Sequence, residues 1–441
     1  MADAAMSATP YWEVTFDADG DVDGGQRERL LAGVSRHGVH DLVVFAHGWN
    51  NDRSGATRLY SRFFAPFPEL APAARIGYAG VVWPSMRFSD EPIPDLPRSV
   101  AADPARRPAL DKDTRRALVG TFPGRAALVE EIARLLERAS REEAELETFG
   151  RLVRLLVEPV PPGPQALFAA DTLTEGGPHG EPEMLTGPTA EVCARFARAL
   201  ADLEPPGAAA GPAPPGVWDG AHELLRQATY YAMKRRAGTV GERGLGPLVG
   251  RLAKAAPGVR VHLVGHSFGA RLVSFALRGL PRGVRAVKSV TLLQGAFSHY
   301  AFAARLPHDA RAGGVLRGQQ HRVDGPLVCC FSRHDTALGT VYPLASRMAG
   351  DDRGAVGEFG VGRLLGAKWG AMGHDGVQAV PGTRAYTLAQ ALARPLPASG
   401  CVNVDAAAVV RRGGPPSGAH SDILHPELAR VVLAAGLTGG R

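Results

Sequence analysis

The sequence predicts an α/β protein in which helices flank a mostly parallel sheet. Short apolar runs have the length and composition of strands that are buried on both faces, a pattern typical of parallel sheets. Segments with helical periodicity separate these runs, as the connections between parallel strands require. The chain has 441 residues, 45% of them hydrophobic and 21% charged, which is enough to bury a large core.

The first part of the core is predicted to span residues 1–86. A mixed-period run at 11–16 indicates a strand, and 27–37 can form a helix. Residues 41–46 are almost wholly apolar and indicate a strand buried on both faces, and 76–83 form a weaker run of the same kind.

A change of pattern marks residues 87–216 as a mainly helical insertion. Apolar residues recur at helical spacing through 125–156, with a break expected near Gly150. Proline-, glycine- and alanine-rich stretches at 159–164 and 205–215 are typical of surface loops or linkers. The alternative is a surface excursion without a function.

Strand and helix signals alternate again from 217 to 441, which we predict to be the remainder of the core. Strands are expected at 259–264, 290–294, 327–331 and 401–404. Helices are expected at 221–236, 245–255, 271–280 and 426–435.

Composition excludes several functional classes. The net charge of +6 comes without a run of five basic residues, so neither nucleic acid nor an anionic membrane is a predicted partner. No apolar stretch has membrane-spanning length. The N-terminal residues carry no basic and apolar signal pattern, which favours a cytoplasmic protein. The four cysteines show no metal-ligand spacing and are expected to be buried thiols.

The motif Gly265-His266-Ser267-Phe268-Gly269 follows a predicted buried strand and opens a predicted helix. A serine on such a tight turn is lifted above the carboxyl end of the strand, and small flanking residues give it room. Gly265 and Gly269 supply that room, and the Phe268 amide is left at a helix N-terminus. We therefore predict Ser267 to be a nucleophile. The alternative is that Ser267 only caps the helix.

A second backbone donor for an oxyanion is expected in the loop after an earlier strand. The strand at 41–46 runs directly into His47, Gly48 and Trp49. Gly48 allows a sharp turn, so the Trp49 amide is predicted to face Ser267, with the Phe268 amide as the other donor. The alternative is a simple turn formed by Asn50 and Asn51.

A serine nucleophile needs an imidazole base and a carboxylate that orients it. Asp335 is the predicted acid, because it lies just past the strand at 327–331. Its alternative role is an N-cap of the residues that follow. Asp324 and Asp405 are the competing carboxylates.

The base is expected late in the chain, in the loop after the last strand. His420 meets this condition and is the predicted base. His425, beside a proline, is more typical of a helix start, and His374 lies in a glycine-rich turn; both remain alternatives.

With these residues in place, the chain resembles the α/β-hydrolase superfamily. The G-H-S-F-G elbow, the strand followed by His-Gly, and the order Ser267, Asp335, His420 carry the resemblance. It covers about 1–86 and 217–441 and implies an α/β-hydrolase fold in which residues 87–216 are a helical cap or lid. One departure is the long glycine-rich stretch between Asp335 and His420.

The resemblance implies a serine hydrolase that forms an acyl-enzyme and needs no metal or organic cofactor. A small acyl substrate, first of all a carboxylic ester, is the expected partner; thioesters, amides and acyl transfer remain open, as does the oligomeric state. Trp49, Tyr230 and Tyr231 are candidates for an acyl pocket or for plain core. The alternative from another class is a non-catalytic binding or scaffold protein with the same fold.

Overall fold

A computed structural model describes most of the chain. The described residues are 6–49, 51–86, 88, 110–157, 164–173, 182–203, 215–338, 370–414 and 418–438. The predicted linker at 205–215 lies outside these residues except for Pro215, and Asn50 also lies outside them.

Eight strands form one parallel sheet in the order β1-β3-β2-β5-β6-β8-β10-β9. The α/β architecture with a mostly parallel sheet is therefore confirmed. The strands are β1 (Tyr11–Thr15), β2 (Asp41–Ala46), β3 (Ile76–Val82), β5 (Arg260–His266), β6 (Val287–Leu293), β8 (Pro326–Phe331), β9 (Arg384–Thr387) and β10 (Gly400–Asp405).

Helices cover both faces of the sheet because the central strands are apolar on both sides. In β2, Leu42 and Val44 belong to one buried cluster, whereas Val43 and Phe45 belong to the other. The first face packs against α1 (Gly24–Arg36), α9 (Val217–Thr239), α10 (Gly246–Ala255) and α11 (Phe268–Gly279). The second face packs against α2 (Arg53–Phe64), α3 (Phe67–Leu70), α15 (Leu388–Ala393) and α16 (Pro426–Thr438).

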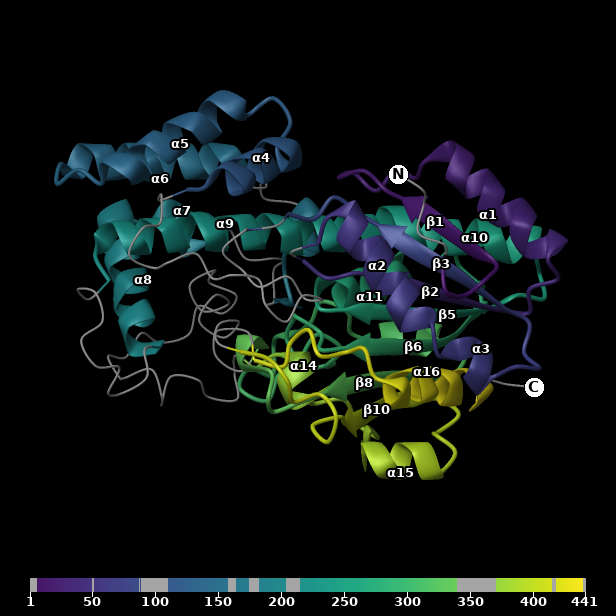
Figure 1. Cartoon of the computed structure of the whole chain (residues 1–441). Helices are drawn as coiled ribbons and strands as arrows, with labels where there is room; N and C mark the ends of the chain where they lie inside the picture. The colour runs from purple at the N-terminus through teal and green to yellow at the C-terminus, as the bar shows by residue number, and fades with distance from the viewer. Residues whose placement is uncertain are drawn as a thin grey trace.

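The described part of residues 87–216 is mainly helical. It contains α4 (Lys112–Thr121), α5 (Ala126–Arg138), α6 (Glu143–Val157), α7 (Glu183–Thr186) and α8 (Thr189–Leu203). Figure 1 shows α5 to α8 grouped at the end of the molecule toward which the sheet's arrows point, with α9 running from them to the sheet. Their buried apolar side chains join the same cluster as the first sheet face, so the insertion and the core share one hydrophobic interior.

A buried ion cluster also ties the insertion to the core. Asp171 forms ion pairs with the fully buried Arg271 of α11 and with Lys234 of α9, and it accepts a 3.1 Å hydrogen bond from the Ser298 amide. Next to it, β4 (Thr172–Leu173) pairs antiparallel with β7 (Gly313–Gly314). Removing one partner of such a buried pair is strongly destabilising, so this cluster holds the insertion in place.

Three details differ from the sequence expectations. The break in the insertion helices lies at Ala139, which has a left-handed φ of 45°, and not at Gly150. Gly150 lies inside α6, where a Cβ would overlap the Thr189 side chain, so the glycine serves close helix packing. The strand β9 was not predicted, because its four residues are short of apolar character and largely exposed at the sheet edge. A π-helical turn, η3 (Val240–Leu245), links α9 to α10.

Among the described residues, no helix combines the length and the apolar character needed to cross a bilayer.

Candidate functional site

Ser267 forms the whole connection between β5 and α11. Its backbone has φ 57° and ψ −119°, a conformation that L-residues rarely adopt and that is retained at sites where strain serves a purpose. A Cβ on Gly269 would overlap the Ala46 carbonyl at the end of β2, and a Cβ on Gly265 would overlap the backbone of Gly269. Both glycines are thus required by the close packing of the turn.

Ser267, His420 and Asp335 form one hydrogen-bonded chain. The Nε2 atom of His420 lies 2.9 Å from the Ser267 Oγ, and its Nδ1 atom lies 2.8 Å from the Asp335 Oδ2. Because a carboxylate only accepts, Nδ1 carries the proton in this arrangement and Nε2 is free to accept the serine proton. Asp335 is fully buried and Ser267 is 5% exposed, so the chain is largely shielded from solvent.

Two loops from neighbouring strands bring the acid and the base together. Asp335 follows β8, and His420 lies in the loop that follows β10. The Ala419 amide donates a 2.9 Å hydrogen bond to the His334 carbonyl. Gly418 has a φ of 57°, and a Cβ there would collide with Thr336, so a glycine is needed for the two loops to approach this closely.

Asp335 combines the two roles that the sequence left open. One carboxylate oxygen lies against the His420 ring, and the other accepts a 3.1 Å hydrogen bond from the Leu338 amide. The backbone hydrogen bond fixes the carboxylate, so helix capping supports its orientation of the imidazole instead of competing with it.

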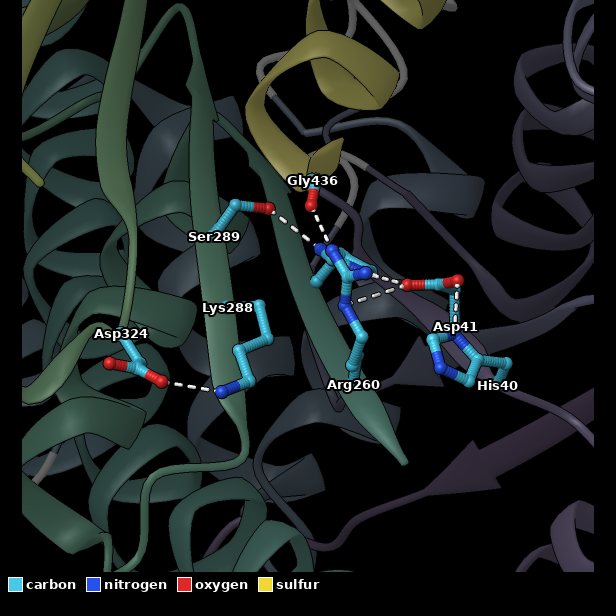
Figure 2. A network of polar contacts seen from close by, with 8 residues as sticks. His40, Asp41, Arg260, Lys288, Ser289, Asp324 and Gly436 are labelled. Atoms are coloured by element: carbon cyan, nitrogen blue, oxygen red, sulfur yellow. Dashed lines mark hydrogen bonds and ion pairs between the residues drawn. The ribbon is translucent and has the colours of Figure 1, made fainter. Parts of the chain in front are cut away.

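The other carboxylates and histidines that the sequence offered as the acid or the base have other hydrogen-bond partners. Asp405 accepts a 2.9 Å hydrogen bond from the Ala407 amide, and His425 contacts Asp422. His374 bonds Asp375 through Nδ1, and this hydrogen bond raises the pKa of His374 above its ordinary value. Asp324 precedes β8 at its amino end, where it pairs with Lys288 (Figure 2) and with Arg285. Ser267, in contrast, follows the carboxyl end of β5.

His266 is a site residue that the sequence reasoning did not single out. Its Nε2–H donates a 2.9 Å hydrogen bond to the His420 carbonyl. Burial lowers the pKa of His266 to about 3, which keeps the ring neutral at ordinary pH. Its place next to Ser267 within the glycine-flanked motif was the signal available in the sequence.

The loop after β2 lies directly against Ser267. A Cβ on Gly48 would lie 2.7 Å from the Ser267 Cβ, a distance that leaves no room for a larger residue. The loop is anchored by its neighbour His47, whose amide donates to the Tyr60 hydroxyl (3.0 Å) and whose carbonyl accepts from the Trp83 indole (2.9 Å).

The candidate oxyanion donors lie on this loop and on α11. The helix begins at Phe268, whose amide therefore has no acceptor within the helix. The rings of Trp49 and Phe268 lie 6.4 Å apart. The Asn51 side chain donates to the Trp49 carbonyl at 3.3 Å, which helps to hold Trp49 in place. The alternative turn at Asn50 and Asn51 is not tested, because Asn50 lies outside the described residues.

The aromatic candidates for an acyl pocket pack against the hydrophobic core. Tyr230 lies 5.2 Å from Trp49 and 4.6 Å from Phe268 between ring centroids. Tyr231 also packs against the core cluster. A cavity of about 670 Å³ lies beside the loop that follows β2, between Asn51, Trp83 and α4. Its described lining residues do not include Ser267.

A second chain of the same three residue types occurs near the amino ends of the central strands β2, β5 and β6. The His262 ring bonds the Ser289 hydroxyl through Nδ1 (2.9 Å) and Asp41 through Nε2 (2.8 Å) (Figure 2). Ser289 is 1% exposed and lies within β6, so it has neither a strained turn nor a helix N-terminus beside it. The hydrogen-bonded chain alone is therefore not what distinguishes Ser267.

Within the part of the chain that the structure describes, no cluster of three or more histidine, cysteine, aspartate or glutamate side chains has an arrangement that could hold a metal ion.

Comparisons with protein-family models, with curated proteins and with solved structures found no match to this chain. Its functional assignment therefore depends on its own geometry.

Proposed function

We propose that this protein is a serine hydrolase with an α/β-hydrolase fold, acting on an acyl substrate of which a carboxylic ester is the first choice. The observation that carries the proposal is the Ser267–His420–Asp335 chain, in which a serine on a strained strand-to-helix turn bonds an imidazole that a buried carboxylate orients.

The reaction follows from the protonation states of the three side chains. His420 Nε2 accepts the Ser267 proton as Oγ attacks the acyl carbonyl. The tetrahedral intermediate collapses, His420 donates that proton to the leaving alcohol, and an acyl-serine remains. Water then attacks the acyl-serine with the same proton transfers in turn, which releases the acid and restores the Ser267 hydroxyl.

Two backbone amides are proposed to hold the oxyanion that forms on the carbonyl oxygen. The Phe268 amide lies at a helix N-terminus, where the helix dipole favours negative charge. The Trp49 amide belongs to the loop that Gly48 brings against Ser267. Neither donor needs to move far when charge develops, because both belong to tightly packed turns.

The insertion is proposed to act as a cap over the site. Its helices α5 to α8 lie beyond the carboxyl ends of the strands (Figure 1). Ser267 and Asp335 follow the carboxyl ends of β5 and β8, and Ser267 is 5% exposed. A covered site limits the substrates that reach the serine.

The same three side chains also suit the hydrolysis of thioesters or amides, and acyl transfer to an alcohol or amine instead of water. A non-catalytic binding protein is the alternative from another class. The intact hydrogen-bonded chain favours an enzyme, since a binding module needs neither the strained serine backbone nor the fully buried carboxylate that orients His420.

Hydrolysis of short-chain aryl esters and acyl thioesters by the full chain tests this proposal. Turnover is expected with at least one class and is expected to fall by about 10³-fold or more in Ser267→Ala. A native chain that is well folded and hydrolyses none of these substrates would favour the binding-protein alternative.

A further inference from the structure

The loop that follows β2 lies between two switch points of the sheet, where the connections of adjacent strands diverge to opposite faces. β2 leads to α2 and α3 on the second face, whereas its neighbour β5 leads to α11 on the first face. Its other neighbour, β3, leads into the insertion, whose buried side chains also join the cluster of the first face. Ligands of open α/β sheets bind at such switch points, beyond the carboxyl ends of the strands.

One switch point carries the proposed nucleophile, and the other carries a cavity. Ser267 lies at the carboxyl end of β5, and Gly48 of the loop packs against it. The cavity of about 670 Å³ has as its described walls Asn51 with the start of α2, the end of β3 with Trp83, the end of β1, and α4. This volume is within the range of small-molecule sites. The described lining residues include none of the three proposed catalytic side chains, so the cavity is a separate feature of the molecule.

Hydrogen bonds join the walls of this cavity to one another. The Ser85 hydroxyl, after β3, donates a 2.6 Å hydrogen bond to the Asn51 carbonyl in the loop after β2. Arg236 of α9 donates to the Pro84 carbonyl at 2.8 Å and to the Thr121 carbonyl of α4 at 3.1 Å. The loop after β3 is therefore fixed to both of the other walls, and the cavity is largely formed in advance of binding.

The described walls are largely apolar. Phe16 and Trp83 contribute aromatic rings, and Val82, Met86 and Ala117 contribute smaller or more flexible apolar side chains. Aromatic rings that are held in place offer a large apolar contact area at a low cost in side-chain entropy. These walls suit a ligand that buries apolar surface on binding.

The charged side chains in the described walls have partners within the protein. Arg116 pairs with Asp113 at 3.0 Å, and Arg53 pairs with Glu13 at 2.5 Å. Asp52 caps α2, where it accepts a 2.7 Å hydrogen bond from an amide of the first turn. A ligand therefore needs no charge of its own to bind beside these residues.

We propose that this cavity is a second binding site, which takes an uncharged, largely apolar small molecule. Such a ligand would pack against Asn51 and Trp83, the two side chains that hold the loop after β2. Asn51 donates to the Trp49 carbonyl at 3.3 Å, and the Trp83 indole donates to the His47 carbonyl at 2.9 Å. Occupancy of the cavity is therefore expected to change the reactivity of Ser267 without contact with it. This coupling rests on the proposed function, whereas the binding does not.

Fluorescence titration of the full chain with N-phenyl-1-naphthylamine tests the binding. This probe is uncharged, and its emission rises in apolar surroundings. Residues 113, 116, 117, 120 and 121 line the cavity at the spacing of one helix face, so Gly120 lies on the face of α4 that forms the wall. A Cβ on Gly120 meets nothing within 4 Å, so Gly120→Leu can extend from the wall without a clash, and Gly120→Ala is the smaller step. The control is Gly24→Leu, at an exposed glycine of α1 that does not line the cavity and whose Cβ also meets nothing.

Saturable binding of one probe molecule is expected for the native chain and for Gly24→Leu. Gly120→Leu is expected to bind the probe at least about tenfold more weakly, and Gly120→Ala to lie between the two. Unfolding curves that match the native chain would show that the variants are folded. Absence of saturable binding, or equal affinity in Gly120→Leu and the native chain, would overturn the proposal.

The rate of fluorophosphonate labelling, with and without saturating probe, tests the coupling. We expect the probe to change this rate at least about threefold in the native chain and in Gly24→Leu, and to leave it unchanged in Gly120→Leu at the same probe concentration. A rate that the bound probe does not alter would overturn the coupling. A native chain that binds the probe but is not labelled at all would contradict the proposed function and not the binding site.

Discussion

The ring of His266 donates its Nε2 proton to the carbonyl oxygen of His420 at 2.9 Å. The residue that immediately precedes the proposed nucleophile therefore also holds the backbone of the proposed base. Through this bond, the strand β5 and the loop after β10 are fixed relative to each other at the point where proton transfer is proposed to occur.

Replacing His266 tests this positioning role. His266→Ala is expected to lower kcat by about 10- to 100-fold with little change in KM, because the base is displaced while substrate contacts remain. His266→Gln retains an N–H donor of similar reach and is expected to restore much of the loss. Equal impairment of both variants would indicate a general packing effect instead of a hydrogen bond to His420.

Burial lowers the pKa of several histidines, among them His47 and His266, and makes the stability of the fold depend on pH. Burial lowers the pKa of His47 to about 4 and that of His266 to about 3, from an ordinary value of 6.5. Between pH 6.5 and 4 each ring is protonated only in the unfolded state, so the free energy of unfolding falls as pH falls, by up to about 1.4 kcal/mol per pH unit for each ring.

Denaturant unfolding between pH 7 and 4.5 measures this slope. His266→Gln removes the titration of His266, and the slope of this variant is expected to be smaller than that of the native chain by about one proton. The comparison cancels the contribution of the carboxylates, which are the same in both proteins. Identical slopes would contradict a neutral, buried His266.

Asp335→Asn separates the two bonds of this side chain. The asparagine oxygen can still accept from the Leu338 amide, but its amide nitrogen cannot accept the His420 Nδ1 proton. We expect kcat to fall by about 10⁴-fold with the fold retained. Asp405→Asn, a competing carboxylate that bonds the Ala407 amide, is the matched control and is expected to keep its activity.

Gly48→Ala tests the close contact between the loop after β2 and the serine. The new methyl group would lie 2.7 Å from the Ser267 Cβ, so either the loop or the serine must move. We expect kcat to fall at least about tenfold, because the Trp49 donor and the nucleophile are displaced relative to each other. Gly258→Ala, where a Cβ meets nothing within 4 Å, is expected to have near-native activity.

The parts of the fold that the sequence predicted well are the strongly apolar ones. The predicted strand at 41–46 has the same bounds as β2, because the five residues after Asp41 are all apolar and buried. The strand β9 was missed because an exposed edge strand of four residues has no such pattern. The sequence predicts a helix break near Gly150, because glycine has a low helix propensity. In the structure the Thr189 side chain packs against that glycine, and the chain turns at Ala139 instead.

For the candidate site, chain order and strand ends selected Ser267, Asp335 and His420, and the His420 ring lies within hydrogen-bonding distance of both other side chains. Their catalytic roles remain predictions. The motif places His266 beside Ser267, but its hydrogen bond to the His420 carbonyl joins residues 154 positions apart, and the motif alone does not reveal that contact.

The most direct test of the proposed function is covalent labelling with a fluorophosphonate, which reacts with activated serines. The native chain, Ser267→Ala and Ser289→Ala are compared, since Ser289 also bonds a histidine that contacts an aspartate. We predict labelling of the native chain and of Ser289→Ala, and none of Ser267→Ala. Labelling that persists in Ser267→Ala, or a folded native chain that is not labelled, would contradict the assignment of Ser267 as the nucleophile.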